Sequence, residues 1–187
     1  MFSHSILSKS RIFIAFGLLM LVGTTVAVAA KGGWSDDEVP IKGNFTVSIA
    51  FIQNSSACGV GDNCIMCVNH DPPRFYIQAE GVGDTSRLGS LFLKIQKCAD
   101  PTASPFGSYQ GTFAMTAPNG KDSLSGIYTG KNTSGGDVYG FLPFSGELKI
   151  TGGTGRFDNA RGHARFTALS GPNGTAFYAV DGELSSR

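Results

Sequence analysis

Hydrophobic and polar residues alternate along most of the chain after residue 40. In the first such segment, residues 42–53, one face carries only apolar side chains, which are Phe45, Val47, Ile49 and Phe51. Side chains of a strand point alternately to opposite faces, so this pattern is typical of a half-buried antiparallel strand. Seven further segments show it, near residues 73–82, 87–98, 108–117, 122–130, 144–151, 160–169 and 174–184. The sequence therefore predicts eight strands, and no helical periodicity follows the first thirty residues.

The segments are joined by short connections rich in glycine, proline and asparagine. The Asn119-Gly120 pair lies between two of them and predicts a tight hairpin. Glycine inside a strand weakens it unless the sheet bends sharply there, as it must where a small barrel closes. Six glycines fall at such positions, namely Gly89, Gly111, Gly126, Gly146, Gly162 and Gly182. We therefore expect an all-β fold, an antiparallel eight-stranded barrel, with a β-sandwich as the alternative.

The first thirty residues have the composition of a secretory signal peptide. Lys9 and Arg11 precede an apolar run at residues 12–28 that ends in small residues. The pattern predicts cleavage after Ala29 or Ala30, and a secreted or periplasmic protein. A membrane anchor is the competing interpretation, because roughly 17 apolar residues is at the lower limit for a span.

Length and charge limit what the remaining chain can be. Removing thirty of the 187 residues leaves enough chain for one domain with a substantial core. We expect a flexible segment at residues 31–41 and a single barrel domain at residues 42–187. This part carries 13 basic residues against 14 acidic ones, because the first thirty hold two of the 15 basic residues and none of the acidic ones. Without a block of Lys or Arg, nucleic acid is not expected as a partner.

Four cysteines, Cys58, Cys64, Cys67 and Cys98, follow the predicted signal, three of them in a predicted loop at residues 54–72. In an oxidising compartment an even number indicates two disulfides, whose pairing the sequence leaves open. A bond from Cys67 to Cys98 would close a loop of about thirty residues and add roughly 3–4 kcal/mol of stability. A four-cysteine zinc site is the alternative, because Cys64 and Cys67 have the spacing that lets both sulfurs face one ion. No other metal and no cofactor is expected.

The glycine-rich stretch at residues 150–166, "ITGGTGRFDNARGHARF", has two interpretations. A phosphate-binding loop would need a lysine before Ser or Thr and a helix after the glycines. Here Arg156-Phe157 follows Gly155, and the next residues alternate like a strand. The glycines are therefore better explained as positive-φ positions in a turn between antiparallel strands.

The same stretch resembles a known family. Residues 152–157 followed by Ala160-Arg161-Gly162 are similar to the "GGTGxFxxARG" segment of plant dirigent proteins, which share an eight-stranded barrel with allene oxide cyclases. Similar segments occur in uncharacterised exported bacterial proteins, which often carry a stretch like residues 84–89, and the chain looks closest to these. The resemblance implies the same barrel and, in dirigent proteins, a pocket of carboxylates and an arginine that steers coupling of phenoxy radicals. Arg161 matches the arginine of the segment, whereas Arg156 stands where several dirigents carry an acidic residue.

Three basic or titratable residues, Arg161, His163 and Arg165, share one face of the predicted strand at residues 160–169. If this face lines the barrel, it forms an anion site with Arg156 nearby, in which His163 can change charge between pH 5 and 8. Arg161 and His163 would then also be the weak candidates for catalysis. If the face meets solvent, it is the polar side of a half-buried strand, and this interpretation is favoured.

The sequence supports three functional hypotheses. The leading one is a non-catalytic barrel that binds one small apolar or amphipathic molecule, since barrels of eight strands can hold a small ligand. The second is a dirigent-like or cyclase-like enzyme acting on a small hydrophobic substrate. The third is a structural or interaction protein without a pocket. No oligomeric state is predicted.

Overall fold

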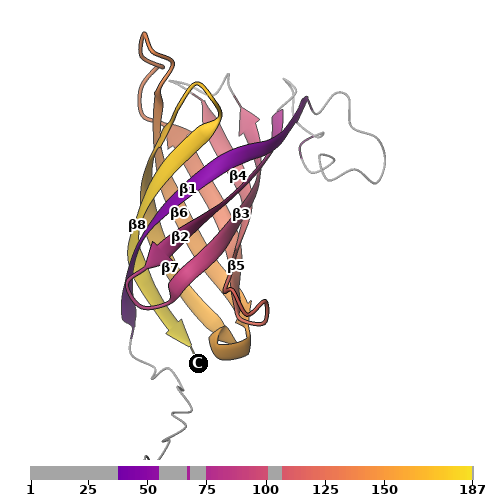
Figure 1. The fold of residues 1–187 in the computed structure, drawn as a ribbon, viewed down its shortest axis with the longest axis vertical. Helices are drawn as coiled ribbons and strands as arrows, with labels where there is room; N and C mark the ends of the chain where they lie inside the picture. Colours follow the sequence, from indigo (N-terminus) through magenta and orange to yellow (C-terminus); the bar gives the residue numbers. More distant parts are fainter. Residues whose placement is uncertain (1–37, 55–66, 68–74, 101–106, 187) are drawn as a thin grey trace, which may run out of the picture. The chain divides into compact units, whose positions relative to one another are not determined.

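The computed structural model describes residues 38–54, 67, 75–100 and 107–186, which form a closed antiparallel barrel (Figure 1). Its eight strands are β1 (Val39–Asn54), β2 (Phe75–Thr85), β3 (Gly89–Asp100), β4 (Ser108–Thr116), β5 (Ser123–Asn132), β6 (Leu142–Thr154), β7 (Ala160–Ser170) and β8 (Thr175–Ser186). Each strand pairs with its neighbours in sequence, and β8 pairs with β1 to close the barrel. The predicted eight-stranded barrel is confirmed, and the β-sandwich alternative is wrong.

Each predicted strand segment overlaps one observed strand. One difference is at the start, where β1 begins at Val39, inside the segment expected to be flexible. Ile41 explains this extension, since its side chain is buried in the core and pairs with Gly182 of β8. The predicted signal peptide and most of the predicted loop at residues 54–72 lie outside the described residues. Among the residues described, no helix is long and apolar enough to cross a membrane.

The barrel interior is filled by alternate residues of every strand. In β3, for example, Leu91, Leu93 and Ile95 are each at most 2% exposed, while the residues between them face outward. Gly126 of β5 shows how the wall bends to close. A Cβ there would collide with the carbonyl oxygen of Lys149, and the pairing of β5 with β6 shifts register at this residue. An interior glycine thus marks a sharp bend, as the sequence predicted.

One end of the barrel is closed by turns, and we call it the η3 end. The short 3-10 turn η3 (Gly155–Phe157) joins β6 to β7 there, beside the β2–β3 and β4–β5 turns and the C-terminus (Figure 1). The predicted hairpin at Asn119-Gly120 lies at this end, with Gly120 at φ +66° and its N–H donated to the carbonyl of Ala117. Phe157 is 1% exposed, so its ring plugs the barrel interior at this end.

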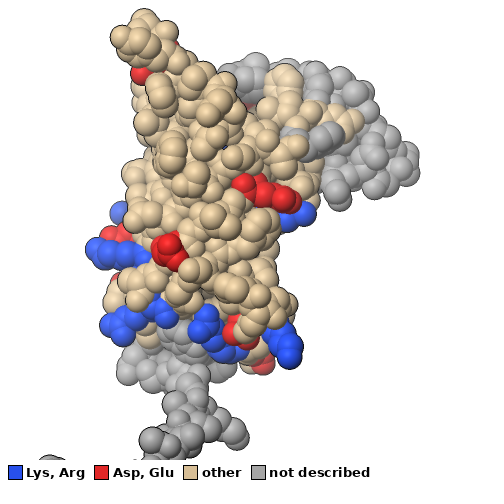
Figure 2. Space-filling model, in the orientation of Figure 1, with Lys and Arg blue, Asp and Glu red and all other residues tan. Residues whose placement is uncertain are grey.

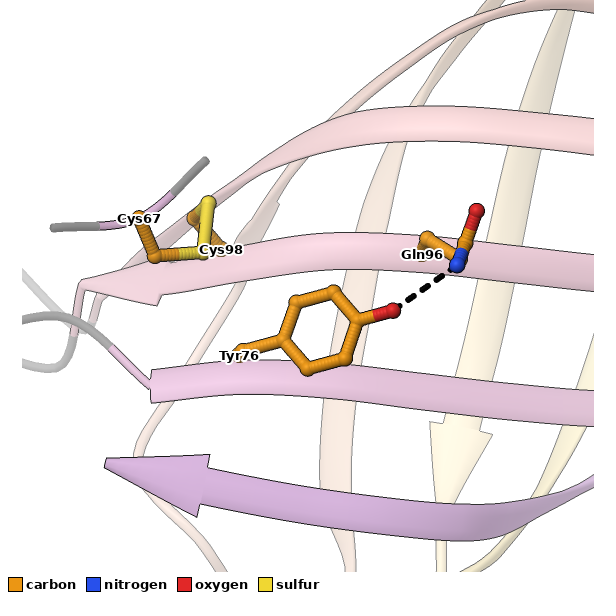
Figure 3. Close-up of a disulfide and its surroundings, with 4 residues drawn as sticks. All are labelled: Cys67, Tyr76, Gln96 and Cys98. Atoms are coloured by element: carbon orange, nitrogen blue, oxygen red, sulfur yellow. Dashed lines mark hydrogen bonds between the residues drawn. A yellow bond between two sulfur atoms is a disulfide. The ribbon is translucent and has the colours of Figure 1, made fainter. Parts of the chain in front are cut away.

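A disulfide joins Cys67 to Cys98 of β3 (Figure 3). It spans 31 residues of sequence, which corresponds to roughly 3–4 kcal/mol of stabilisation in the chain-entropy model. Cys98 packs with Cys67 and Tyr76 in a small buried cluster outside the main core, where Gln96 donates a hydrogen bond of 2.8 Å to the Tyr76 hydroxyl. A zinc site of four cysteines would need all four as thiolates, and two of them, Cys67 and Cys98, form this disulfide instead. The other two cysteines, at positions 58 and 64, lie outside the described residues.

Candidate functional site: a buried lysine in an aromatic cavity

Lys97 is the unusual residue of the barrel interior. It follows Leu91, Leu93 and Ile95 at the same period of two and therefore points inward from β3. Its side chain is 6% exposed, and it is the one charged residue buried within the described part of the chain. Gly111 of β4 lies directly opposite, and a Cβ there would lie 2.6 Å from the Lys97 Cα. Glycine at that position lets β4 approach closely and leaves interior space for the lysine.

Aromatic rings surround the Lys97 amine. Its Nζ lies 4.1 Å from the ring centroid of Tyr109, 5.1 Å from that of Phe144 and 5.3 Å from that of Tyr128. Ring centroids within about 6 Å attract a cation through the negative ring face. Phe166 and Tyr178 extend this group, with ring centroids 5.4 Å apart. We call these five residues, Tyr109, Tyr128, Phe144, Phe166 and Tyr178, the aromatic cluster.

A cavity of about 190 Å³ opens beside the lysine. Lys97, Tyr109, Phe144 and Tyr178 line it together with small and aliphatic side chains, which include Val47, Ile77, Ala79 and Ala176. It lies where β1, β3 and β7 end and β2, β4, β6 and β8 begin, at the end opposite η3, which we call the Lys97 end. An apolar groove of about 370 Å³ shares Ile77, Tyr109 and Leu142 with this cavity and continues its wall.

The environment of Lys97 favours its neutral amine. Burial lowers its pKa from 10.5 to about 7, since the charged form loses its hydration. Burial also raises the pKa of Tyr128 well above its ordinary value and that of Tyr178 to about 12, so these hydroxyls stay neutral at pH 7. Tyr109, whose pKa burial likewise raises, donates a hydrogen bond of 2.6 Å to Asn132 Oδ1. Within the described residues, no carboxylate forms an ion pair with Lys97.

The predicted basic row lies elsewhere. Arg161, His163 and Arg165 project from the outer face of β7 and are exposed, while Ala164 and Phe166 point into the core. Arg165 Nε lies 3.9 Å from Glu147 Oε1 at the surface. The structure does not bring any of the three into the Lys97 cavity. It agrees with the favoured interpretation of this row as the polar side of a half-buried strand.

Arg156 forms part of the turn at the η3 end. Its Nε lies 3.2 Å from Asp122 Oδ2, and its Nη2 donates a hydrogen bond of 2.7 Å to the carbonyl of Leu88. Gly155 precedes it at φ +61°, and a Cβ there would collide with the Asp122 carboxylate. The predicted turn is confirmed at Gly155, which has a positive φ, but Gly152 and Gly153 belong to β6 and do not, so the positive-φ interpretation is wrong for these two glycines.

The outer wall carries two distinct surfaces. In the view of Figure 2, charged side chains gather toward the η3 end, and few appear toward the Lys97 end. Two pairs of apolar side chains lie on this wall, Leu169 with Phe177 and Val82 with Phe92, and Thr46 of β1 lies between the two pairs in the same register. The four apolar side chains are 41–64% exposed. Two open hollows lie on this wall. Val82, Leu169 and Phe177 line the first of them, and Ala179 lines both.

Comparison with family models, with curated proteins and with solved structures found no match for this chain. The resemblance of residues 152–162 to dirigent proteins therefore stays a prediction. The carboxylates of the dirigent pocket have no counterpart in the described interior, where Lys97 is the one buried charged residue.

The sequence analysis missed Lys97, although its signal was present. The apolar period of Leu91, Leu93 and Ile95 continues to position 97, which places a lysine on the interior face. The aromatic cluster could not be predicted from the sequence, because its five residues come from five different strands, β4 to β8. A buried amine beside a cavity can donate hydrogen bonds, pair with an anion or act as a nucleophile.

Proposed function

We propose that this barrel binds one small amphipathic molecule at its Lys97 end, in an oxidising compartment outside the cytoplasm. The observation that carries the proposal is the 190 Å³ cavity that has the Lys97 amine in its wall. Ligand sites are typically concave and mostly apolar, with a few polar groups that fix the orientation of the ligand. The cavity has this composition.

The size of the site suits a small ring or a short chain. A dry cavity of roughly 150 Å³ in another protein takes up benzene, so about 190 Å³ holds a group of that size. The adjoining groove of about 370 Å³ extends the apolar surface past Tyr109 and Leu142. Cavity and groove together reach the lower part of the range of small-molecule sites, about 300–1,000 Å³.

The polar end of the ligand is an oxygen-bearing group that meets Lys97. Among the described residues of the cavity wall, Lys97 carries the only ammonium or amine, and apolar side chains occupy most of the rest. An oxygen acceptor at Nζ would satisfy a donor to which the described residues otherwise present ring faces. The disulfide at Cys98 supports the proposed location, because disulfides persist in the secretory pathway and periplasm.

A matched pair of substitutions on β8 tests the location of the site. Ala176 is buried and lines the cavity, whereas Ala179 is exposed and lines both outer hollows. We expect 3-phenylpropanoate and 3-phenylpropanol to bind the full chain with one-to-one stoichiometry in calorimetry and native mass spectrometry. Ala176→Leu should weaken this binding about tenfold or more by filling the cavity, and Ala179→Leu should leave it unchanged.

Two outcomes contradict the proposal. Loss of binding in Ala179→Leu alone would place the site on the outer wall. No binding across a panel of aromatic and aliphatic acids, alcohols and aldehydes would favour a structural or interaction protein instead. The Tm of both variants must be measured, because overpacking a core commonly destabilises it by about 1–3 kcal/mol.

A further inference from the structure

We propose that Lys97 binds its ligand covalently, as an imine formed with a small aromatic or aliphatic aldehyde. The inference rests on the proposed function and names the reacting group of the ligand. Its basis is the position of the amine, which is buried, lines a cavity and lies among ring faces without a carboxylate partner in the described residues. An amine in such a place is a nucleophile rather than a surface charge.

The groups that face the amine decide which ligand chemistry fits. Around it lie the rings of Tyr109, Tyr128 and Phe144, and Ile77 of β2 and Tyr178 of β8 share the cavity wall with it. These groups are apolar or stay neutral at pH 7, so the described cavity wall offers the ammonium no opposite charge, and the one described carboxylate beside it is Asp100, which lines the adjoining groove. A carboxylate ligand can bind as an ion pair with the ammonium, but burying two ions costs more than burying a neutral molecule, so we expect it to bind more weakly than an alcohol or an aldehyde. An aldehyde requires the neutral amine, which this wall favours.

The protonation state supports the same conclusion. With a pKa of about 7, roughly half of the Lys97 side chains are neutral at pH 7. An ordinary lysine, with a pKa near 10.4, is neutral in only about one molecule in 2,500 at that pH. Lowering the pKa of a lysine by desolvation is the general route by which proteins turn it into a Schiff-base nucleophile.

The reaction is a condensation without oxidation or reduction. The lone pair of Nζ attacks the carbonyl carbon, the C–N bond forms, and the carbonyl π electrons move to oxygen. That oxygen takes up a proton while the nitrogen loses one, which gives a carbinolamine. The nitrogen then loses its second proton, the hydroxyl leaves as water, and a C=N bond remains. One aldehyde and one amine therefore give one imine and one water.

The aromatic cluster positions such a ligand. The phenyl ring of an aromatic aldehyde can pack against Phe144 and Tyr178, which line the cavity and whose ring centroids lie 5.3 Å apart at 85°. Edge-to-face contacts of this kind are favourable beyond the burial of the rings. The neighbouring disulfide at Cys98 ties the same segment of β3 to Cys67. The nucleophile is thus held by a short, cross-linked part of the barrel wall.

Reductive trapping tests the inference. The full chain, with its disulfide intact, is incubated at pH 7 with 3-phenylpropanal and sodium cyanoborohydride, which converts an imine into a stable secondary amine. We expect peptide mapping to find one labelled lysine, Lys97, with any label on the chain's α-amine counted separately, because an ordinary α-amine pKa of about 8 also permits reaction at pH 7. Lys94 is the internal control, because it lies on the outer face of the same strand with its Nζ 3.4 Å from Glu80 Oε1. Labelling of Lys97 should be at least about tenfold faster than that of Lys94.

Two variants and a pH series complete the test. Lys97→Met should abolish the fast labelling, and Lys94→Met should leave it unchanged. The ratio of labelling at Lys97 to labelling of an ordinary lysine should be highest near pH 7 and fall toward pH 10, because only the ordinary lysine gains neutral amine over that range while the reductant acts on both imines alike. Equal labelling of the two lysines, or fast lysine labelling that persists in Lys97→Met, would overturn the inference.

The unreactive analogue 3-phenylpropanol separates this inference from the proposed function. If the alcohol binds in a way that Ala176→Leu weakens, but the aldehyde is not trapped on Lys97, the imine is wrong and the binding function stands. If neither compound binds and none is trapped, both proposals fail. Trapping on Lys97 together with binding of the alcohol supports both.

Discussion

The two ends of the barrel differ in what fills the interior between the same eight strands. At the η3 end, Phe157 fills the interior and the Arg156–Asp122 ion pair joins neighbouring turns. At the Lys97 end, the interior holds a buried amine, five aromatic rings and a cavity. The first arrangement serves stability, because it buries apolar surface and pairs its charges. The second opposes stability, since a buried amine without a carboxylate partner among the described residues is unfavourable for folding. A binding function gives this unfavourable arrangement a reason.

The largest expected effect is a gain of stability on replacing Lys97 with methionine. Moving a lysine pKa from 10.5 to about 7 corresponds to roughly 5 kcal/mol, at about 1.36 kcal/mol per pH unit. The folded state disfavours the proton, so this cost is fully present below pH 7, shrinks as the pH rises and vanishes above about pH 10.5. Lys97→Met should therefore raise the free energy of unfolding by up to about 5 kcal/mol at pH 6, and by little at pH 10.5.

Denaturant unfolding of both proteins at pH 6, 8 and 10 measures this difference. Lys94→Met, on the outer face of the same strand, is the control and should change stability by less than about 1 kcal/mol at each pH. A loss of stability in Lys97→Met at pH 6 would mean that the amine stabilises the fold, and the contrast between the two ends would disappear.

The second largest change in stability is expected from a substitution at the η3 end. Phe157→Ala removes a ring that is 1% exposed and should destabilise the barrel by about 3–5 kcal/mol, because it removes buried surface and leaves a cavity. Phe177→Ala is the matched control, since that ring is 56% exposed on the outer wall and should cost less than about 1 kcal/mol. If the two substitutions cost the same in denaturant unfolding, Phe157 is not a plug.

The sequence predicted the η3 end better than the Lys97 end, for a physical reason. The turn at residues 155–159 is specified locally, by Gly155 at a positive φ and by the alternation that starts at Ala160. The Lys97 site depends on which strands lie across the interior from β3, and this follows only from the closure of the barrel. Alternation could place Lys97 inside, but no local pattern could bring Tyr178 to it from 81 positions further along the chain.

A smaller effect is expected from Asp122, which connects the turns of the η3 end. Hydrogen bonds from the Asn119 side chain and from the Arg156 backbone N–H lower its pKa, and the Arg156 guanidinium adds to this. A lowered carboxyl pKa stabilises the fold above the ordinary value near pH 4, and this contribution is lost as the pH falls through the folded-state pKa. Asp122→Asn should therefore lower the Tm by a few degrees at pH 7 (about 2–6 °C) and by much less at pH 2.5.

Scanning calorimetry at the two pH values checks the prediction for Asp122. Asp137→Asn, in the connection between β5 and β6, is a comparison at the opposite end of the barrel. Its Oδ1 accepts hydrogen bonds from the N–H groups of Tyr139 and Phe141. Because an amide oxygen can keep both bonds, its Tm should fall less than that of Asp122→Asn. An equal fall for both would show that Asp122 has no special part in closing the η3 end.

The smallest expected effect concerns the basic row on β7, which belongs to neither end. Arg161, His163 and Arg165 are exposed on the outer face, so replacing each with alanine should change stability by about 0.5 kcal/mol or less. The same substitutions should leave binding of 3-phenylpropanoate unchanged within about twofold, because the row faces away from the Lys97 cavity. A tenfold loss of affinity in Arg161→Ala, with an unchanged Tm, would restore the anion site that the sequence suggested as an alternative. It would also move the functional surface from the end of the barrel to its outer wall.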